Sequence, residues 1–215
     1  MDNYSEKYWE KLWQSEAAEE LLKYLEGYYK FSYNIMEIFK QNGIKKICDA
    51  ACGFGGYTLA YVSNGFEVES FDVSKAAVDF TKMGLEKYGF DTSKVKAADM
   101  LKTGYEDSYF DGVLVNSVID HLTAEDAKKA LDEMFRIVRE GGLVAISFDG
   151  LEDDDVTAEH EILEDGSFRY TGEDARKGMI FHQYDVDEID SLLQGKTILF
   201  QGVNGRKQQV VVLRK

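Results

Sequence analysis

The chain has 215 residues, of which 44% are apolar and 30% are charged, a composition ordinary for one globular domain with a sizeable core. Its formal net charge of −15 disfavours nucleic acid as a partner, because a polyanion would be repelled. No apolar run approaches the roughly 18 residues that span a bilayer, and no signal peptide is recognisable, so a cytoplasmic location without membrane partners is expected.

The first part of the chain is predicted to be helical. Apolar residues recur at helical spacing from Ser15 onward, and we expect Ser15 to open this stretch. Gly27 is placed to bend or split it, and Gly43 to end it as a C-cap. We therefore expect residues 1–43 to form an N-terminal helical cap on a single domain that covers residues 1–215.

Beyond residue 43, short apolar runs typical of strands alternate with stretches in which apolar residues have helical spacing. The predicted strands are 44–49, 67–71, 94–98, 110–118 and 143–148. Ser74 is expected to cap the helix after the second strand. Thr123 and Asp126 have the spacing of a capping box, and their helix is expected to run through Arg139. This alternation predicts a doubly wound α/β fold with a mostly parallel sheet.

Two features follow the fifth strand. Residues 149–185 form a long acidic insertion, in which a hairpin is predicted around Asp165 and Gly166. After a helix near 186–193, Asn204-Gly205 separates two strand-like runs, which is a strong hairpin signal. The sheet is therefore predicted to have seven strands and to finish in an antiparallel hairpin.

The turn after the first strand, CDAACGFGGYT at residues 48–58, has the composition of a ligand-binding turn. Read as A-x-G-x-x-G from Ala51, it is a degraded dinucleotide fingerprint that points to NAD. Read as D-x-A-x-G-x-G from Asp49, it points to S-adenosylmethionine. The only cysteines, Cys48 and Cys52, match no common metal-binding spacing and are expected to be reduced thiols.

Polar side chains end four consecutive predicted strands: Asp49, Asp72, Asp99 and Asn116. The carboxyl ends of parallel strands meet at one edge of an open sheet, where ligands bind. Asp72 follows Gly53 at about the distance of a ribose-binding acid, but NAD and S-adenosylmethionine would both use that acid. An acid at Asp49 favours S-adenosylmethionine, since that ligand has no phosphate and carries an ammonium and a sulfonium.

Four segments, in order, resemble the motifs of the class I S-adenosylmethionine-dependent methyltransferases. They are ICDAACGFGGYT, VESFDVS, AADM and FDGVLVNSVIDHL. The likeness extends through FRIVREGGLVAISF and the closing hairpin, so it covers residues 44–148 and the C-terminal strands. It implies a Rossmann-like methyltransferase fold and S-adenosyl-L-methionine as cofactor, with S-adenosyl-L-homocysteine as product.

The resemblance also assigns residues to the cofactor. They are Asp49, Ala51, Gly53 and Gly55 at the methionine end, Asp72 at the ribose with Val73 beside it, Asp99 and Met100 at the adenine, and Asn116 beside the sulfonium. Ala51 departs from the family, which usually has glycine there, and its methyl group needs slightly more room. For Asp72 and Asp99, helix capping or turn formation is the alternative role.

Methyl transfer needs the nucleophile and the methyl group held about 3 Å apart, with a base only where the nucleophile is protonated. His121 closes the fourth motif and is the candidate base, with a local structural bond as its alternative role. His160 and His182 lie in the insertion and are expected at the surface. Asp120 and His121 resemble part of a metal site of some related enzymes, but Ser117 replaces a further acid, so we expect no metal.

The acceptor is expected to be a small molecule. Residues 116–119 contain neither the proline pair of amino-methylating DNA enzymes nor the cysteine of cytosine-C5 enzymes. Tyr4, Tyr8, Trp9 and Trp13 could cover the cofactor mouth or pack on the core. An NAD-dependent oxidoreductase and a non-catalytic S-adenosylmethionine sensor remain as alternatives.

Overall fold

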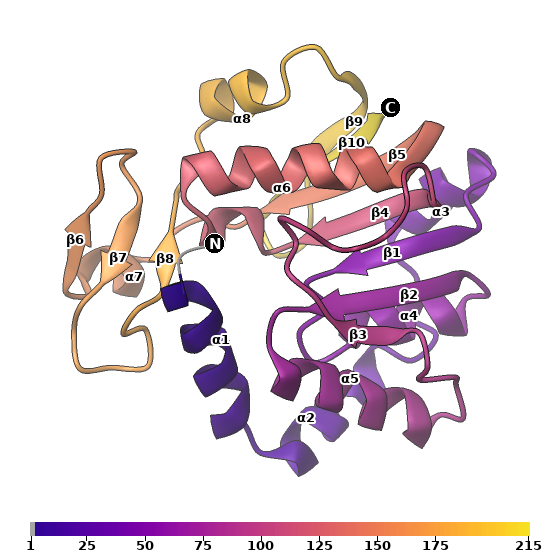
Figure 1. The fold of residues 1–215 in the computed structure, drawn as a ribbon, viewed down its shortest axis with the longest axis horizontal. Coiled ribbons are helices and arrows are strands. Elements are labelled where there is room, and N and C mark those ends of the chain that lie inside the picture. Colours follow the sequence, from indigo (N-terminus) through magenta and orange to yellow (C-terminus); the bar gives the residue numbers. More distant parts are fainter. Residues whose placement is uncertain (1–2) are drawn as a thin grey trace.

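The computed structural model describes residues 3–215, and its centre is one sheet of seven strands (Figure 1). The strands are β1 (Lys46–Ala50), β2 (Glu67–Asp72), β3 (Val95–Ala97), β4 (Phe110–Asn116), β5 (Val138–Phe148), β9 (Thr197–Val203) and β10 (Gln209–Arg214). Their order is β3-β2-β1-β4-β5-β10-β9; the first five are parallel, and β10 runs antiparallel to both its neighbours. The predicted fold class is confirmed.

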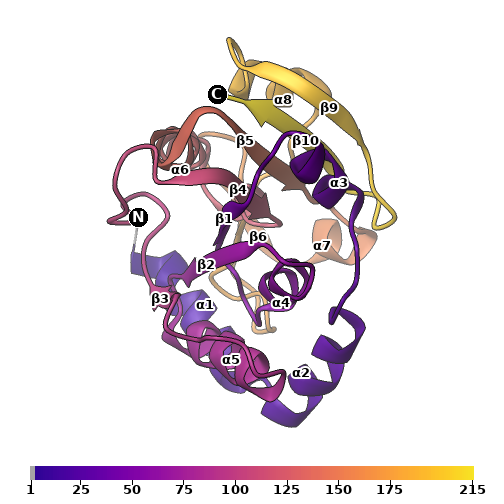
Figure 2. The ribbon, with the colours of Figure 1, turned by 90° about the vertical axis from the view of Figure 1, so that its right-hand side faces the viewer.

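Helices cover both faces of this sheet (Figure 2). They include α4 (Gly56–Ser63), α5 (Lys75–Lys87), α6 (Ala124–Ile137) and α8 (Val186–Leu192). Successive side chains of a strand point to opposite faces. In β1, Cys48 and Ala50 therefore pack in the core beneath α6 and α8, whereas Ile47 packs in the core beneath α4. Burial on both faces explains why the central strands are continuous apolar runs.

The N-terminal segment forms α1 (Asn3–Ser15), α2 (Ala18–Tyr24), a 3-10 turn (Leu25–Gly27) and α3 (Asn34–Gln41). The prediction that Ser15 opens a helix is wrong, because α1 starts earlier and ends at that residue. The split at Gly27 is confirmed, and Gly43 follows α3 with a φ of +70°. In Figure 1, α1 lies between the insertion and α5.

The end of α6 also differs from the prediction. The helix stops at Ile137, and Arg139 lies in β5, where its Nε donates to Asp111 at 2.7 Å. This ion pair holds Arg139 against β4, where the pairing of β4 with β5 shifts register between Phe110 and Gly112. At the start of α6, Thr123 Oγ1 accepts from Asp126 N at 3.3 Å, but the Asp126 carboxylate pairs with Lys129 instead of completing a capping box.

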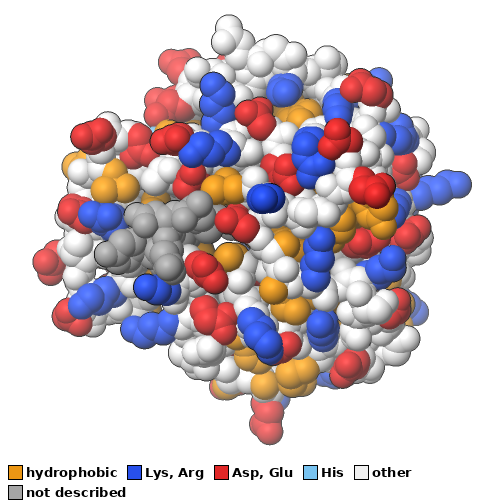
Figure 3. Space-filling view, viewed as in Figure 1, with side chains coloured by type: hydrophobic (Ala, Val, Ile, Leu, Met, Phe, Trp, Pro, Cys, Tyr) orange, Lys and Arg blue, Asp and Glu red, His pale blue; other side chains and the backbone are white. Residues whose placement is uncertain are grey.

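The insertion contains α7 (Asp153–Thr157) and a small sheet of β6 (His160–Ile162), β7 (Phe168–Tyr170) and β8 (Ile180–Phe181). The predicted hairpin around Gly166 is confirmed, with that residue at a φ of +83°. The hairpin of β9 and β10 is confirmed as well. No helix in residues 3–215 is both long and apolar enough to cross a bilayer. Acidic and basic side chains are interspersed over the face in Figure 3.

Candidate functional site

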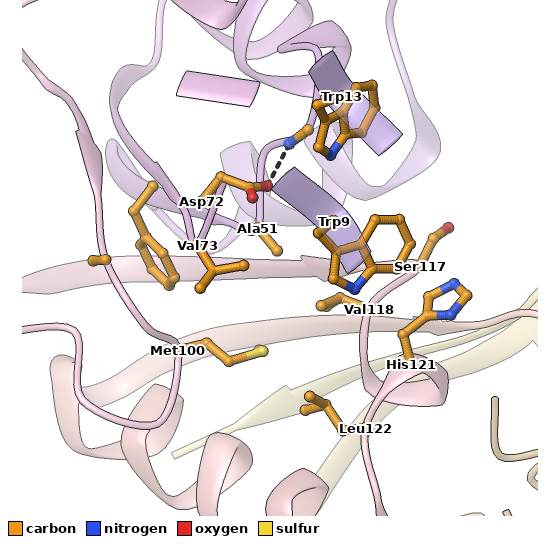
Figure 4. A pocket seen from close by; sticks show the side chains of 13 residues that line it. Trp9, Trp13, Ala51, Asp72, Val73, Met100, Ser117, Val118, His121 and Leu122 are labelled. Carbon is orange, nitrogen blue, oxygen red and sulfur yellow. Dashed lines mark hydrogen bonds between the residues drawn. The ribbon is translucent and has the colours of Figure 1, made fainter. Parts of the chain in front are cut away.

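A pocket lies beside the carboxyl ends of β1, β2 and β4, beneath α1 (Figure 4). Its walls come from α1, the glycine turn, the ends of the strands and the turn that precedes α6. The lining residues are Trp9, Trp13, Ala51, Gly53, Phe71, Asp72, Val73, Ala98, Met100, Ser117, Val118, His121 and Leu122. The pocket is mostly apolar with a few polar groups, as small-molecule sites usually are.

The glycine turn has an unusual backbone. Ala51, Gly53 and Gly55 have φ values of +59°, +54° and +85°, in the left-handed region. A Cβ on Gly55 would lie 2.8 Å from Thr81 Oγ1, so only glycine fits there. A residue with a Cβ in this conformation costs about 1–2 kcal/mol, so Ala51 is strained. Replacing the usual glycine with Ala51 therefore costs energy mainly because of the left-handed backbone conformation, and less because of the space that the methyl group occupies.

Asp72 ties the glycine turn to the start of α5. Its Oδ2 accepts from Gly53 N and its Oδ1 from Ser74 N, both at 2.9 Å. The side chain lines the pocket although the residue is only 5% exposed, and burial raises the pKa of its carboxyl to about 6. Asp72 thus has the structural role that we gave as an alternative, and it still faces the pocket.

Asp49 lies outside the pocket lining. It is 2% exposed and accepts a 2.6 Å hydrogen bond from Thr58 Oγ1 on α4. Cys48 and Ala50 point to the face beneath α6, so alternation along β1 sends Asp49 to the opposite face. Burial raises the pKa of its carboxyl to about 7, with a smaller contribution from the charge of Asp72. The structure therefore places this acid behind the turn.

The other predicted cofactor residues are divided. Ala51, Gly53, Val73 and Met100 line the pocket together with Asp72. Three others do not line it: Asp99, Asn116 and Gly55. Asp99 Oδ1 accepts a hydrogen bond from Leu101 N at 2.8 Å, and Asn116 Oδ1 accepts one from Ser147 Oγ at 3.0 Å. Gly55 packs against Thr81. The first two side chains thus order local turns and strand ends rather than facing the pocket.

His121 lines the pocket at the end opposite the glycine turn. Its Nδ1 lies 3.2 Å from the carbonyl oxygen of Ile180 in the insertion. Its ring packs edge-to-face with the rings of Trp9 and Phe181, at centroid distances of 4.9 and 5.3 Å. Burial lowers the pKa of the imidazole, which is therefore neutral at physiological pH.

The aromatic residues of α1 are also divided. Trp9 and Trp13 reach into the pocket, and a Cβ built on Gly53 would lie 3.0 Å from the Trp13 ring. Tyr8 instead donates to Met179 Sδ in the insertion, at 3.4 Å. The side chain of Tyr4 lies outside the described part of the chain. Thus α1 contacts both the glycine turn and the insertion.

Sequence reasoning missed several residues of this region. Ser117, Val118 and Leu122 line the pocket, and Asp149 follows β5 near His121. The signal for Asp149 was present, because it comes directly after the apolar run 143–148, as Asp72 comes after its own strand. The predicted insertion 149–185 includes this residue, so the sequence pattern assigns it to the insertion and not to a strand end.

Residues 48–146, somewhat less than half of the chain, match the family model described as "Methyltransferase domain". A S-adenosylmethionine-dependent methyltransferase from Methanosarcina mazei superposes with a TM-score of 0.70 at 19% identity, over 86% of this chain and 98% of that one. The 1,6-didemethyltoxoflavin-N1-methyltransferase of Burkholderia thailandensis, solved with bound 1,6-didemethyltoxoflavin and S-adenosylhomocysteine, superposes with a TM-score of 0.64 at 16% identity. The superposition covers 94% of this chain and 80% of that one.

A carboxy-S-adenosyl-L-methionine synthase from Photobacterium profundum is 28% identical over 123 residues, which are 55% of this chain and 49% of that protein. The chain spans about half the length of the curated relatives it matches. At these identities, the solved structures establish the fold, and the segment that matches the methyltransferase family model lies within it.

Proposed function

We propose that residues 48–146, which match the methyltransferase family model, form a class I methyltransferase domain. On this premise the chain binds S-adenosylmethionine and methylates a small-molecule acceptor. The observation that carries the proposal is the charge of the pocket. Asp72 is the only charged side chain among the described lining residues, which include no lysine or arginine. An acid beside aromatic rings suits a ligand with a sulfonium and an ammonium better than a dianionic pyrophosphate.

The backbone supports the same choice. A dinucleotide site presents free N–H groups of the glycine turn to the pyrophosphate. Here the N–H of Gly53 is bonded to Asp72, which leaves less donor capacity for a phosphate. Asp72 can accept from ribose hydroxyls with its remaining lone pairs, and Met100 with Val73 offers an apolar wall for the adenine. The rings of Trp9 and Trp13 can face the sulfonium. Asp49 does not line the pocket, so it would act on the cofactor only through its electric charge and not by direct contact.

When bound, S-adenosylmethionine supplies a methyl group on a sulfonium, so in-line displacement needs no acid for the leaving group. The residues of this chain must therefore position the acceptor and remove a proton where it has one. The neutral imidazole of His121 can take that proton at its Nε2, because Nδ1 faces the carbonyl of Ile180. Edge-to-face packing with Trp9 and Phe181 holds the ring in place.

Calorimetric titration of the purified chain tests the cofactor. S-adenosylhomocysteine should bind and raise the melting temperature, and NAD should do neither. Tighter binding of NAD would overturn the proposal in favour of an oxidoreductase. A screen of small hydroxyl, amine and thiol acceptors, with mass detection of the methylated product, tests the reaction. Binding without transfer to any acceptor would support a non-catalytic sensor.

A further inference from the structure

Asp120 is the most poorly satisfied polar residue described in the chain. It lies in the 3-10 turn Ile119–His121 after β4 and is 0% exposed. Both of its carboxylate oxygens are buried without a hydrogen-bond partner of ordinary geometry. An unpaired buried carboxylate is costly, and such groups normally coordinate a cation or are paired. The surroundings of Asp120 therefore need an explanation.

Two further ligand-type side chains converge on Asp120. One atom each of Asp120, His121 and Asp149 lies within 4.8 Å of the others, and Asp120 Oδ2 lies 3.8 Å from His121 Nε2. Asp149 reaches the cluster from the end of β5, which neighbours β4 in the sheet. Two carboxylates and one imidazole thus meet beside the pocket wall that His121 forms.

The orientation of the imidazole suits a metal ligand. Nδ1 lies 3.2 Å from the carbonyl oxygen of Ile180, to which it can only donate. The proton is therefore on Nδ1, and the lone pair of Nε2 points toward the carboxylates. Histidine ligands of metals are typically fixed in this way, with the second nitrogen bonded to a carbonyl or carboxylate.

Nothing described in the protein neutralises the two carboxylates. Among the ion pairs of residues 3–215, none joins a lysine or arginine to Asp120 or Asp149. Asp149 Oδ1 accepts from the neutral groups Ser117 Oγ and Gln208 Nε2. The carboxyl groups of Asp120 and Asp149 therefore lie close together with only His121 as a neighbouring ligand-type side chain in the described cluster. A cation would relieve both the burial and the repulsion.

We propose that Asp120, His121 and Asp149 bind a divalent transition-metal ion, with the remaining coordination positions open to water or to an oxygen ligand in the pocket. Ligand atoms around such an ion lie about 3–3.5 Å apart, so the cluster would contract by roughly an ångström on binding. Carboxylates alone suit Mg²⁺ or Ca²⁺, whereas an imidazole in the set favours Mn²⁺ or Zn²⁺.

The expectation of no metal counted Asp120 and His121 and missed the third ligand, Asp149, because the two segments are distant in sequence. The inference does not depend on the proposed function, since an ion can bind with or without a cofactor. It does change the role of His121, because Nε2 cannot hold an ion and accept a proton at once. With an ion bound, ionisation of the acceptor or of a bound water would fall to the metal.

The test uses the full chain, freed of metal by a chelator, with Mn²⁺ alone as the probe at neutral pH. Electron paramagnetic resonance of free Mn²⁺ should show saturable binding of one ion per chain, displaced by Zn²⁺ but not by an excess of Mg²⁺. Asp120→Asn and Asp149→Asn keep the side-chain shape and should each weaken binding at least about ten-fold. Asp99→Asn, just after β3 and outside the cluster, should bind Mn²⁺ as the unaltered chain does.

Melting curves without metal establish that each variant is folded. Asp120→Asn replaces a buried carboxyl group that has no hydrogen-bond partner with an amide of the same shape, so it should melt close to the unaltered chain. If Asp120→Asn fails to fold, His121→Gln removes another ligand of the cluster and should likewise weaken Mn²⁺ binding. Absence of saturable Mn²⁺ and Zn²⁺ binding by the folded chain would overturn the proposal. So would unchanged binding by folded Asp120→Asn and Asp149→Asn, and neither result would bear on S-adenosylhomocysteine binding.

Discussion

Replacing Asp72 with alanine should weaken both the fold and the binding of S-adenosylhomocysteine, and the two losses can be separated. In the structure, the carboxylate of Asp72 accepts one backbone hydrogen bond from Gly53 and one from Ser74. The alanine variant therefore releases the glycine turn and the first turn of α5. If the same carboxylate also binds the ribose hydroxyls, it loses cofactor contacts in addition.

The expected sizes follow from these contacts. Hydrogen bonds to a charged acceptor contribute about 1.5–3 kcal/mol each, but the burial that raises the pKa of Asp72 to about 6 offsets part of this. We expect a net loss of about 1–3 kcal/mol in unfolding free energy, which for a chain of this size lowers the melting temperature by roughly 3–10 °C. Loss of the ribose contact should weaken affinity about ten- to a hundred-fold.

Asp111→Ala is the matched control. Asp111 also accepts two backbone hydrogen bonds, from Lys45 N and Lys46 N at 3.0 and 2.9 Å, but it lies at the amino ends of the strands, away from the pocket. Both variants should melt at lower temperature, and only Asp72→Ala should lose affinity in a calorimetric titration. Equal affinity in the two variants would refute the assignment of Asp72 to the ribose.

Three other predictions concern the turn, the buried acid and α1. Ala51→Gly removes the left-handed strain but adds chain entropy, so it should raise the unfolding free energy by up to about 1 kcal/mol, as urea unfolding can measure. The pKa of Asp49 lies at about 7 in the folded chain, well above the ordinary value of an aspartate, so ionisation costs stability as the pH rises toward 7. Asp49→Asn should thus gain stability relative to the unaltered chain as the pH rises from about 4 to 7; a pH-independent difference would contradict this. Glu10 of α1 accepts hydrogen bonds from Ser74 Oγ and Ala76 N, so Glu10→Ala should speed amide exchange in α1. If α1 and residues 149–185 both cover the site, S-adenosylhomocysteine should slow amide exchange in both segments.

The sequence by itself determined the order and type of the secondary structure, because those depend on local patterns. The apolar runs gave the parallel strands, and Asn204-Gly205 gave the reversed final strand. The position of Asp72 at a strand end and its place in the pocket could also be predicted, since the carboxyl ends of parallel strands share one edge. The start of α1 and the end of α6 could not, because packing and the Arg139–Asp111 pair decide them.

Only the tertiary structure decided which polar strand ends face the pocket. Asp49 and Asp72 look equivalent in sequence, and both emerge on the same face of the sheet. Asp49 pairs in register with Ser70, so it lies two residues further from the carboxyl edge than Asp72 and bonds to Thr58 beneath α4. The same holds for the cluster of Asp120, His121 and Asp149, in which the turn after β4 meets the end of β5. Because β4 and β5 pair in the sheet, these side chains become neighbours, and no local pattern in the sequence records that contact.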